Sequence, residues 1–222
     1  MKLRRYTILI LLSTFSTQLL AQVNESQLGG WYMYFGSVGV KDSPWGFQGD
    51  IQYRNWNLMG DLEQLLLRGG ATYQLEKSKI KFTLGYASIT TGTPGERKTS
   101  VHENRIYQEA LIPGKLGKRF YLKHRLRFEQ RFVESVDFKT RFRYALFTNI
   151  PLNRKEIEKG TLYLALYDEL FMVTNGFFDR NRFYAAAGFK LTSRLSTQVG
   201  YMIQSSQTLS KGQLQVSLHQ SL

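Results

Sequence analysis

Residues 119–144 read RFYLKHRLRFEQRFVESVDFKTRFRY, and this stretch decides the fold. In its first half, basic and polar side chains at odd positions alternate with mostly apolar side chains at even positions. A β-strand turns successive side chains to opposite faces, so this pattern predicts one long strand with a guanidinium face and an apolar face. The pattern returns after a short polar break at residues 133–137. The stretch is therefore predicted to be a hairpin that carries two rows of cations.

The N-terminus has the features of an export signal. It begins MKLRRYT, which is basic and contains no acid, and continues as an apolar segment that polar residues interrupt from Ser13 onward. This arrangement, with the small residue Ala21 at its end, is typical of a secretory signal peptide. The interruptions argue against a membrane-anchoring helix, and no later run reaches the roughly 18 apolar residues that a spanning helix needs. We expect residues 1–21 to be removed and residues 22–222 to form one barrel domain.

Composition excludes several classes of protein. The 222 residues contain no cysteine, which excludes a disulfide framework and thiolate metal sites. The net charge of +13 is compatible with nucleic-acid binding. However, an exported chain rarely meets nucleic acid, and the basic residues lie inside strand-like segments rather than in a tail. We therefore expect no nucleic-acid partner.

Alternation continues along the rest of the chain. It predicts about eleven extended segments of roughly ten to fourteen residues, whereas soluble strands average about five or six and membrane-spanning strands need about nine to eleven. We expect loops at residues 90–100 and 174–180, and no segment has a helical period. The lengths favour an all-β, antiparallel transmembrane β-barrel. Because bacterial single-chain barrels have an even number of strands, we expect ten or twelve, with twelve favoured.

Alternation alone does not say which face lies inside. In a soluble exported β-barrel binding protein, the apolar face would point inward and the arginines outward. A soluble barrel of ten or more strands would enclose an interior too wide for apolar side chains to fill. The 3 Trp and 13 Tyr suit the aromatic girdles of an outer-membrane barrel. We therefore expect the arginines in the lumen and membrane lipid around the barrel.

The predicted lumen face is the candidate site. Guanidinium and carboxylate groups on neighbouring strands can form ladders that close a small lumen, and each cross-strand pair adds about 0.2–1 kcal/mol. Inward cations outnumber inward acids, so a water-filled lumen would favour anionic solutes. Whether the glutamates neutralise enough cations to close the lumen stays open. The candidate lumen residues are Arg105, Arg119, Lys123, Arg125, Arg127, Arg131, Arg141, Arg143, Arg182, Glu103, Glu109, Glu129 and Glu169.

Several short motifs resemble one bacterial family. The run R-x-R-x-E-x-R at residues 125–131 is followed by R-x-R-Y at residues 141–144. Around them lie E-x-R-x-Y-Q from Glu103, D-E-x-F from Asp168 and G-Y-M-x-Q from Gly200. These motifs are similar to the family called domain of unknown function 2490, over nearly the whole exported chain. The resemblance implies an outer-membrane β-barrel, commonly from Bacteroidota-type bacteria, with no established activity.

Several function classes remain open at this point. The first is a structural barrel or a small anion-preferring pore that takes small anionic solutes. The second is a barrel hydrolase acting on lipid or lipopolysaccharide, which would need a nucleophile and a histidine base. The histidines are His102, next to Glu103, then His124 and His219, and no G-x-S-x-G occurs, so we assign no catalytic residue. No motif predicts a cofactor or a metal site. We expect a monomer in the bacterial outer membrane.

Overall fold

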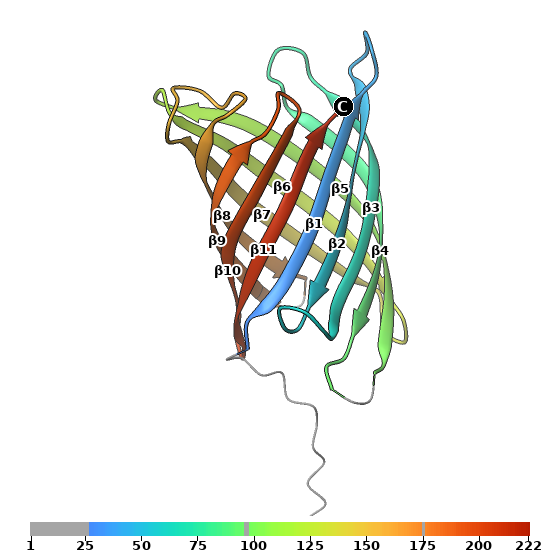
Figure 1. The fold of residues 1–222 in the computed structure, drawn as a ribbon. Coiled ribbons are helices and arrows are strands. Elements are labelled where there is room, and N and C mark those ends of the chain that lie inside the picture. The colour runs from blue at the N-terminus through green and yellow to red at the C-terminus, as the bar shows by residue number, and fades with distance from the viewer. Residues whose placement is uncertain (1–26, 96–97, 175) are drawn as a thin grey trace, which may run out of the picture.

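The computed structural model describes residues 27–95, 98–174 and 176–222, which form eleven β-strands and no helix. The strands are β1 (Gly29–Gly39), β2 (Trp45–Asn55), β3 (Leu62–Gln74), β4 (Lys81–Gly92), β5 (Ser100–Leu116), β6 (Phe120–Val133), β7 (Lys139–Pro151), β8 (Leu162–Val173), β9 (Gly176–Lys190), β10 (Leu195–Ser206) and β11 (Ser210–Ser221). They close into one barrel (Figure 1). Within these described residues, no helix is long and apolar enough to cross a membrane. The predicted signal peptide, residues 1–21, lies outside the described residues.

The way the barrel closes corrects the predicted strand number. The described residues form eleven strands rather than ten or twelve, and β1 pairs with β11 in parallel, from Gly29 opposite Gln213 to Ser37 opposite Ser221. The other neighbouring pairs are antiparallel, as predicted. Strand direction reverses at each antiparallel step, so an entirely antiparallel ring needs an even number of strands. One parallel pair removes that requirement, and the prediction was wrong because it assumed an antiparallel seam.

The odd number of strands places the first and last strand ends at opposite rims. β1 starts at one rim with Gly29, and β11 finishes at the other beside Leu222 (Figure 1). We call these the Gly29 rim and the Leu222 rim. The longest link between strands, residues 152–161, joins β7 to β8 at the Leu222 rim. It folds inward, so that Ile157 packs against buried residues of the interior.

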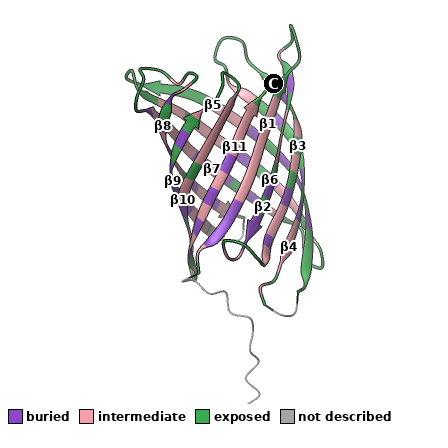
Figure 2. Ribbon diagram, viewed as in Figure 1, coloured by how far each residue is buried: buried purple, intermediate pink, exposed green. Residues whose placement is uncertain are grey.

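Along each strand, the inner and outer faces differ in chemistry. On β4, Thr83 and Ala87 are buried, whereas Phe82, Leu84 and Tyr86 are 46%, 62% and 53% exposed. Figure 2 shows buried and exposed positions following one another along the strands. The buried residues include many charged and amide side chains, and the exposed residues include many large apolar ones. The barrel is therefore polar inside and apolar outside.

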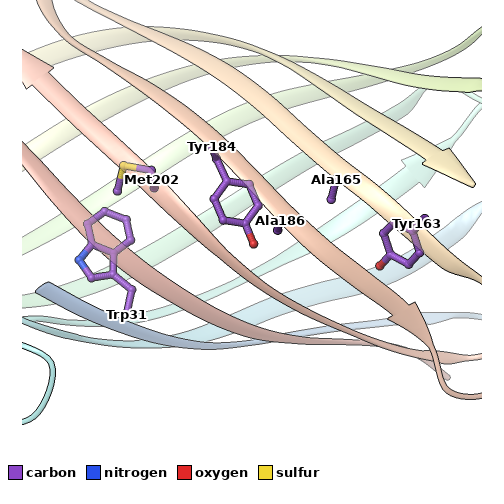
Figure 3. Packing of buried hydrophobic residues seen from close by; sticks show 6 residues of the cluster. All are labelled: Trp31, Tyr163, Ala165, Tyr184, Ala186 and Met202. Carbon is purple, nitrogen blue, oxygen red and sulfur yellow. The ribbon is translucent and has the colours of Figure 1, made fainter. Parts of the chain in front are cut away.

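Apolar packing fills one side of the interior. The cluster joins residues of β1, β8, β9 and β10: Trp31, Tyr163, Ala165, Tyr184, Ala186 and Met202 (Figure 3). Gly188 lies opposite Tyr163, and a Cβ atom there would stand 2.3 Å from the Tyr163 ring. Gly85 has the same relation to Tyr107, also at 2.3 Å. A glycine at each position thus lets a tyrosine ring pack against the barrel wall.

Candidate functional site

The hairpin β6–β7 supplies the centre of the charged interior. Its register places Glu129 opposite Arg141 and puts Arg143 two residues along the same face. Glu129 is 1% exposed and accepts hydrogen bonds from Arg141 Nη2 and Arg143 Nη1, each at 2.7 Å. Arg105 Nη1 and Arg127 Nη1 lie 3.7 and 3.8 Å from its oxygens. One buried carboxylate is thus shared by four guanidinium groups from three strands.

Two further glutamates extend this centre toward the Leu222 rim. Glu169 on β8 accepts a hydrogen bond from Arg125 Nη2 at 2.6 Å and is paired with Arg143 Nη2 at 2.6 Å. Glu109 on β5 accepts hydrogen bonds from Arg127, and Arg125 Nε lies 3.9 Å away. Arg125, Arg127 and Arg143 therefore each bridge two carboxylates.

Two acids extend the centre toward the Gly29 rim. Glu103 accepts hydrogen bonds from Arg105 Nε at 2.6 Å and Arg131 Nε at 2.5 Å. Asp179 accepts hydrogen bonds from Arg141 Nη1 at 3.3 Å and Arg180 Nε at 3.2 Å. All these pairs connect, and we call the set the arginine–carboxylate network: Glu103, Glu109, Glu129, Glu169 and Asp179 with Arg105, Arg125, Arg127, Arg131, Arg141, Arg143, Arg180 and Arg182.

Aromatic rings also contact the interior arginines through cation–π interactions. Phe171 on β8 is 1% exposed and stands amid four guanidinium groups, at 4.4 Å from that of Arg143 and 4.7 Å from that of Arg182. Trp31 lies between Arg182, at 4.9 Å, and Arg54, at 3.8 Å. A cation over an aromatic face is stabilised by the ring quadrupole. Ring and guanidinium therefore alternate across the interior, from Arg54 to Arg143.

The half of the interior nearer the Leu222 rim is more open. A cavity of about 500 Å³ runs from the strand ends at that rim down to Trp31, Arg54 and Arg182. We call its outer part the lysine vestibule, which is lined by Lys81, Lys123, Lys190, Arg194 and His219. In the described part of the chain, no carboxylate oxygen lies within 4.0 Å of Lys81, Lys123, Lys190 or Arg194. The acids that line the cavity, Asp50, Glu109 and Glu169, are already bound to arginines.

The structure brings all but two of the predicted lumen residues into the arginine–carboxylate network. Lys123 lies inside, as predicted, but in the lysine vestibule. Arg119 does not line the lumen: it sits in the β5–β6 turn and donates a hydrogen bond from Nη2 to the carbonyl oxygen of Pro151 at 2.6 Å. Its predicted place was wrong because alternation was extended one residue beyond the start of β6, where the backbone turns.

Sequence reasoning missed Asp179 and its partner Arg180. Residues 174–180 were predicted to be a loop, whereas β9 begins at Gly176. Alternation counted from Arg182 would also turn Asp179 outward, and the register between β8 and β9 shifts nearby. Asp179 nevertheless bonds to Arg141 across the rim. Lys81 and His219 were also not among the predicted lumen residues, and the folded barrel places both in the cavity that Lys123 and Lys190 line.

The histidines do not assemble with the acids next to them in sequence. His102 is exposed, with Nδ1 3.2 Å from Thr90 Oγ1, while Glu103 is buried among arginines. His124 lies on the outer face, where Nδ1 is 2.8 Å from the hydroxyl of Tyr144.

His219 is the histidine that faces the lumen. Its ring stacks on Phe35 with centroids 4.8 Å apart, and Nε2 lies 2.9 Å from Ser217 Oγ. Ser217 is 3% exposed, and within the described residues no carboxylate hydrogen-bonds to the His219 ring. This serine–histidine pair lacks the orienting acid and the accessible hydroxyl of an activated nucleophile. No group of three or more potential metal ligands was found among the described residues.

Comparison with known proteins identifies the family. The family model described as protein of unknown function (DUF2490) matches residues 28–215, so the chain belongs to this family. The resemblance expected from the motifs around the β6–β7 hairpin is thereby confirmed. No curated protein and no solved structure matches the chain.

Proposed function

We propose that this member of the DUF2490 family is an integral outer-membrane β-barrel whose interior is closed by the arginine–carboxylate network. One observation carries the proposal. The barrel exposes large apolar side chains around its wall and buries its charged ones. In water, the apolar outer face of such a barrel would be exposed to solvent. In a bilayer, lipid surrounds that apolar face and the polar side chains line the lumen.

Polar side chains on the outer face support a lipid environment. Several of them hydrogen-bond to one another across neighbouring strands. Tyr86 donates to Asn104 Oδ1 at 2.6 Å, and Gln108 donates to Gln130 Oε1 at 3.2 Å. On lipid-facing surfaces an unpaired polar group is strongly unfavourable, because no water is there to bind it. Cross-strand pairing satisfies these groups within the wall itself.

Strand length supports the same environment. The shortest strands, β1 and β2, have 11 residues, and the longest, β5, has 17. A tilted strand of about nine to eleven residues crosses a hydrocarbon core. Each strand is therefore long enough to span, and the expected signal peptide would deliver the chain to the cell envelope.

The interior favours a closed barrel over a pore. The cavity that opens at the Leu222 rim is bounded below by Trp31, Arg54 and Arg182. Glu103 and Glu129 do not line this cavity, and both are buried against arginines. Because these side chains bond to each other across the lumen, no wide water path is expected. The second candidate, a small anion-preferring pore, draws on the excess of interior cations: eight arginines face five acids in the network.

The membrane part of the proposal is tested by placing a charge on the wall. Val199 is 50% exposed, lies near the middle of β10 and has Ala187 and Val216 as strand neighbours. We expect Val199→Arg to lower the unfolding free energy in lipid vesicles by about 2–4 kcal/mol if the residue faces the bilayer centre. The matched control is Met59→Arg, since Met59 is 85% exposed in the β2–β3 link.

The measurement is a urea titration followed on gels. The folded protein is quantified as its heat-modifiable band, the band whose position changes when the sample is boiled. A soluble barrel would tolerate an extra arginine at Val199 as well as at Met59. Equal stability of the two variants, or a chain that stays in solution without detergent, would overturn the membrane proposal.

Closure is tested by planar-bilayer recording of the purified chain. The closed barrel is expected to give no steady openings. Steady, anion-selective openings would instead support the pore and overturn closure.

A further inference from the structure

Among the described residues, no carboxylate forms an ion pair with Lys81, Lys123 or Lys190 of the lysine vestibule. We infer that it is a binding site for a small organic anion with at least two negative charges, carried on phosphate or carboxylate groups. This inference goes beyond the proposed function. The cavity and its lysines are interior whether lipid or water surrounds the wall.

Cations from three separate strands converge on this site. Lys81 on β4 and Lys123 on β6 lie close enough for their charges to interact. Lys123 and Lys190, the latter on β9, both interact electrostatically with His219 on β11. Like charges held together in a confined space repel one another. An anion between them would turn that repulsion into attraction.

Among the described residues, the acids that line the cavity already bind other groups. Glu109 accepts hydrogen bonds from Arg127 and from Gln48 Nε2, the latter at 3.0 Å, and so faces the network. Glu169 is likewise bound by Arg125 and Arg143. Within the described part of the chain, the third carboxylate that lines the cavity is that of Asp50. It forms an ion pair with Arg68 Nε at 2.9 Å. No carboxylate of the described chain therefore forms an ion pair with the vestibule lysines, and an anion from solution could supply that counter-charge.

Size and lining define the class of ligand. The whole cavity, of which the vestibule is the outer part, has a volume of about 500 Å³, within the range of roughly 300–1,000 Å³ that small-molecule sites occupy. Neutral hydrogen-bonding groups also face the cavity: Gln198 Nε2 donates to the hydroxyl of Tyr163 at 3.2 Å, and Asn149 and Ser196 line the wall. Phe147 adds an apolar surface. Such a lining suits a hydroxyl-bearing organic molecule with charged ends.

The test is isothermal titration of the full-length protein in detergent micelles. Fructose 1,6-bisphosphate and citrate serve as the phosphate and carboxylate probes, with acetate and neutral fructose for comparison. We expect one equivalent of a multiply charged probe to bind at least tenfold more tightly than acetate. Affinity should fall as sodium chloride is added, because salt screens the lysines.

The site is assigned with two variants that remove the same charge. The triple substitution Lys81→Gln, Lys123→Gln and Lys190→Gln is expected to weaken binding at least tenfold. Its matched control, Lys77→Gln, Lys118→Gln and Lys159→Gln, removes three exposed lysines from links at the same rim and should leave affinity unchanged. If the vestibule triple variant lacks the heat-modifiable band, Lys123→Gln alone replaces it, with an expected weakening of at least threefold.

Each outcome decides something. Binding of the bisphosphate alone, of citrate alone or of both supports the site and identifies its phosphate, carboxylate or general anion preference. No saturable binding, equal loss in both triple variants, or unchanged affinity in Lys123→Gln overturns the inference. A chain that fails to bind but still loses stability through Val199→Arg leaves the membrane proposal intact, so the two failures are distinguishable.

Discussion

The arginine–carboxylate network and the lysine vestibule both arise from strands that alternate inward and outward side chains. In the network the inward cations are paired with carboxylates, whereas in the vestibule they are not paired with any carboxylate of the described chain. On β6, Lys123 and Arg127 face the same interior, four residues apart. Arg127 bonds to Glu109 and packs over the Tyr107 ring at 4.7 Å, whereas Lys123 meets no carboxylate within 4.0 Å in the described chain. The difference lies in the supply of acids. The two network acids on the Leu222 side of Glu129, Glu109 and Glu169, are bound by Arg125, Arg127 and Arg143, and Glu103 and Asp179 lie on its Gly29 side.

The choice of cation follows that supply. Arginine offers a planar fork that binds carboxylates through two nitrogens and stacks on rings, and it fills the network. Lysine is a compact, strongly hydrated charge and lines the open vestibule. Under our proposals, the network half of the lumen stabilises the barrel and the vestibule half binds an anion. The predictions below test this division.

The largest effect is expected at the centre of the network. Glu129→Gln keeps the side-chain shape but leaves four guanidinium groups without their shared anion. Breaking a buried charge pair of this kind destabilises a protein by about 3–5 kcal/mol. We expect a loss of this size in urea unfolding. The control Asp137→Asn, on the exposed β6–β7 link, should change stability by less than about 0.5 kcal/mol. Equal losses would contradict the central role of Glu129.

A smaller contrast is expected within β6. Arg127→Gln removes a charged hydrogen-bond donor from Glu109, and we expect it to lower the unfolding free energy by about 2–3 kcal/mol. Lys123→Gln removes a cation that has no acid partner in the described chain, and should stay within about 0.5 kcal/mol of the parent. Parallel urea titrations measure both. If the two variants lose the same stability, the division between network and vestibule is wrong.

The aromatic part of the network is tested by Phe171→Leu. Leucine keeps an apolar side chain but removes the ring face that four arginines share, so we expect a loss of about 1–2 kcal/mol. Phe128→Leu is the matched control, since Phe128 is 39% exposed on the outer wall. Thermal loss of the heat-modifiable band compares them. A larger loss for Phe128→Leu would show that ring–guanidinium packing does not stabilise the interior.

The smallest effect is expected at the rim. Arg119→Gln removes the hydrogen bonds to the carbonyl oxygens of Pro151 and Leu152 and leaves both halves of the lumen unchanged. We expect a change of about 0.5–1 kcal/mol in urea unfolding, with anion binding unaltered. A change in probe affinity would place Arg119 functionally in the vestibule after all.

Much of the interior could be predicted from single strands. The alternation in residues 119–144 predicted the hairpin, and Arg141 and Arg143 do face inward with Arg125 and Arg127. Partner choice could not be predicted. The four guanidinium groups around Glu129 come from β5, β6 and β7, so their meeting depends on the registers of two strand pairs. Asp179 could not be predicted as a lumen residue because its position does not follow the alternation that predicted the other acids of the network.

By itself, the sequence determined that the strands are long and two-faced and that one face is strongly cationic, because alternation is a property of each strand alone. Only the tertiary structure decided the number of strands, the parallel β1–β11 seam and the separation of the arginine–carboxylate network from the lysine vestibule. Those features arise from pairing between strands. A row of charges along one strand has no partners until the closed barrel sets other strands opposite it.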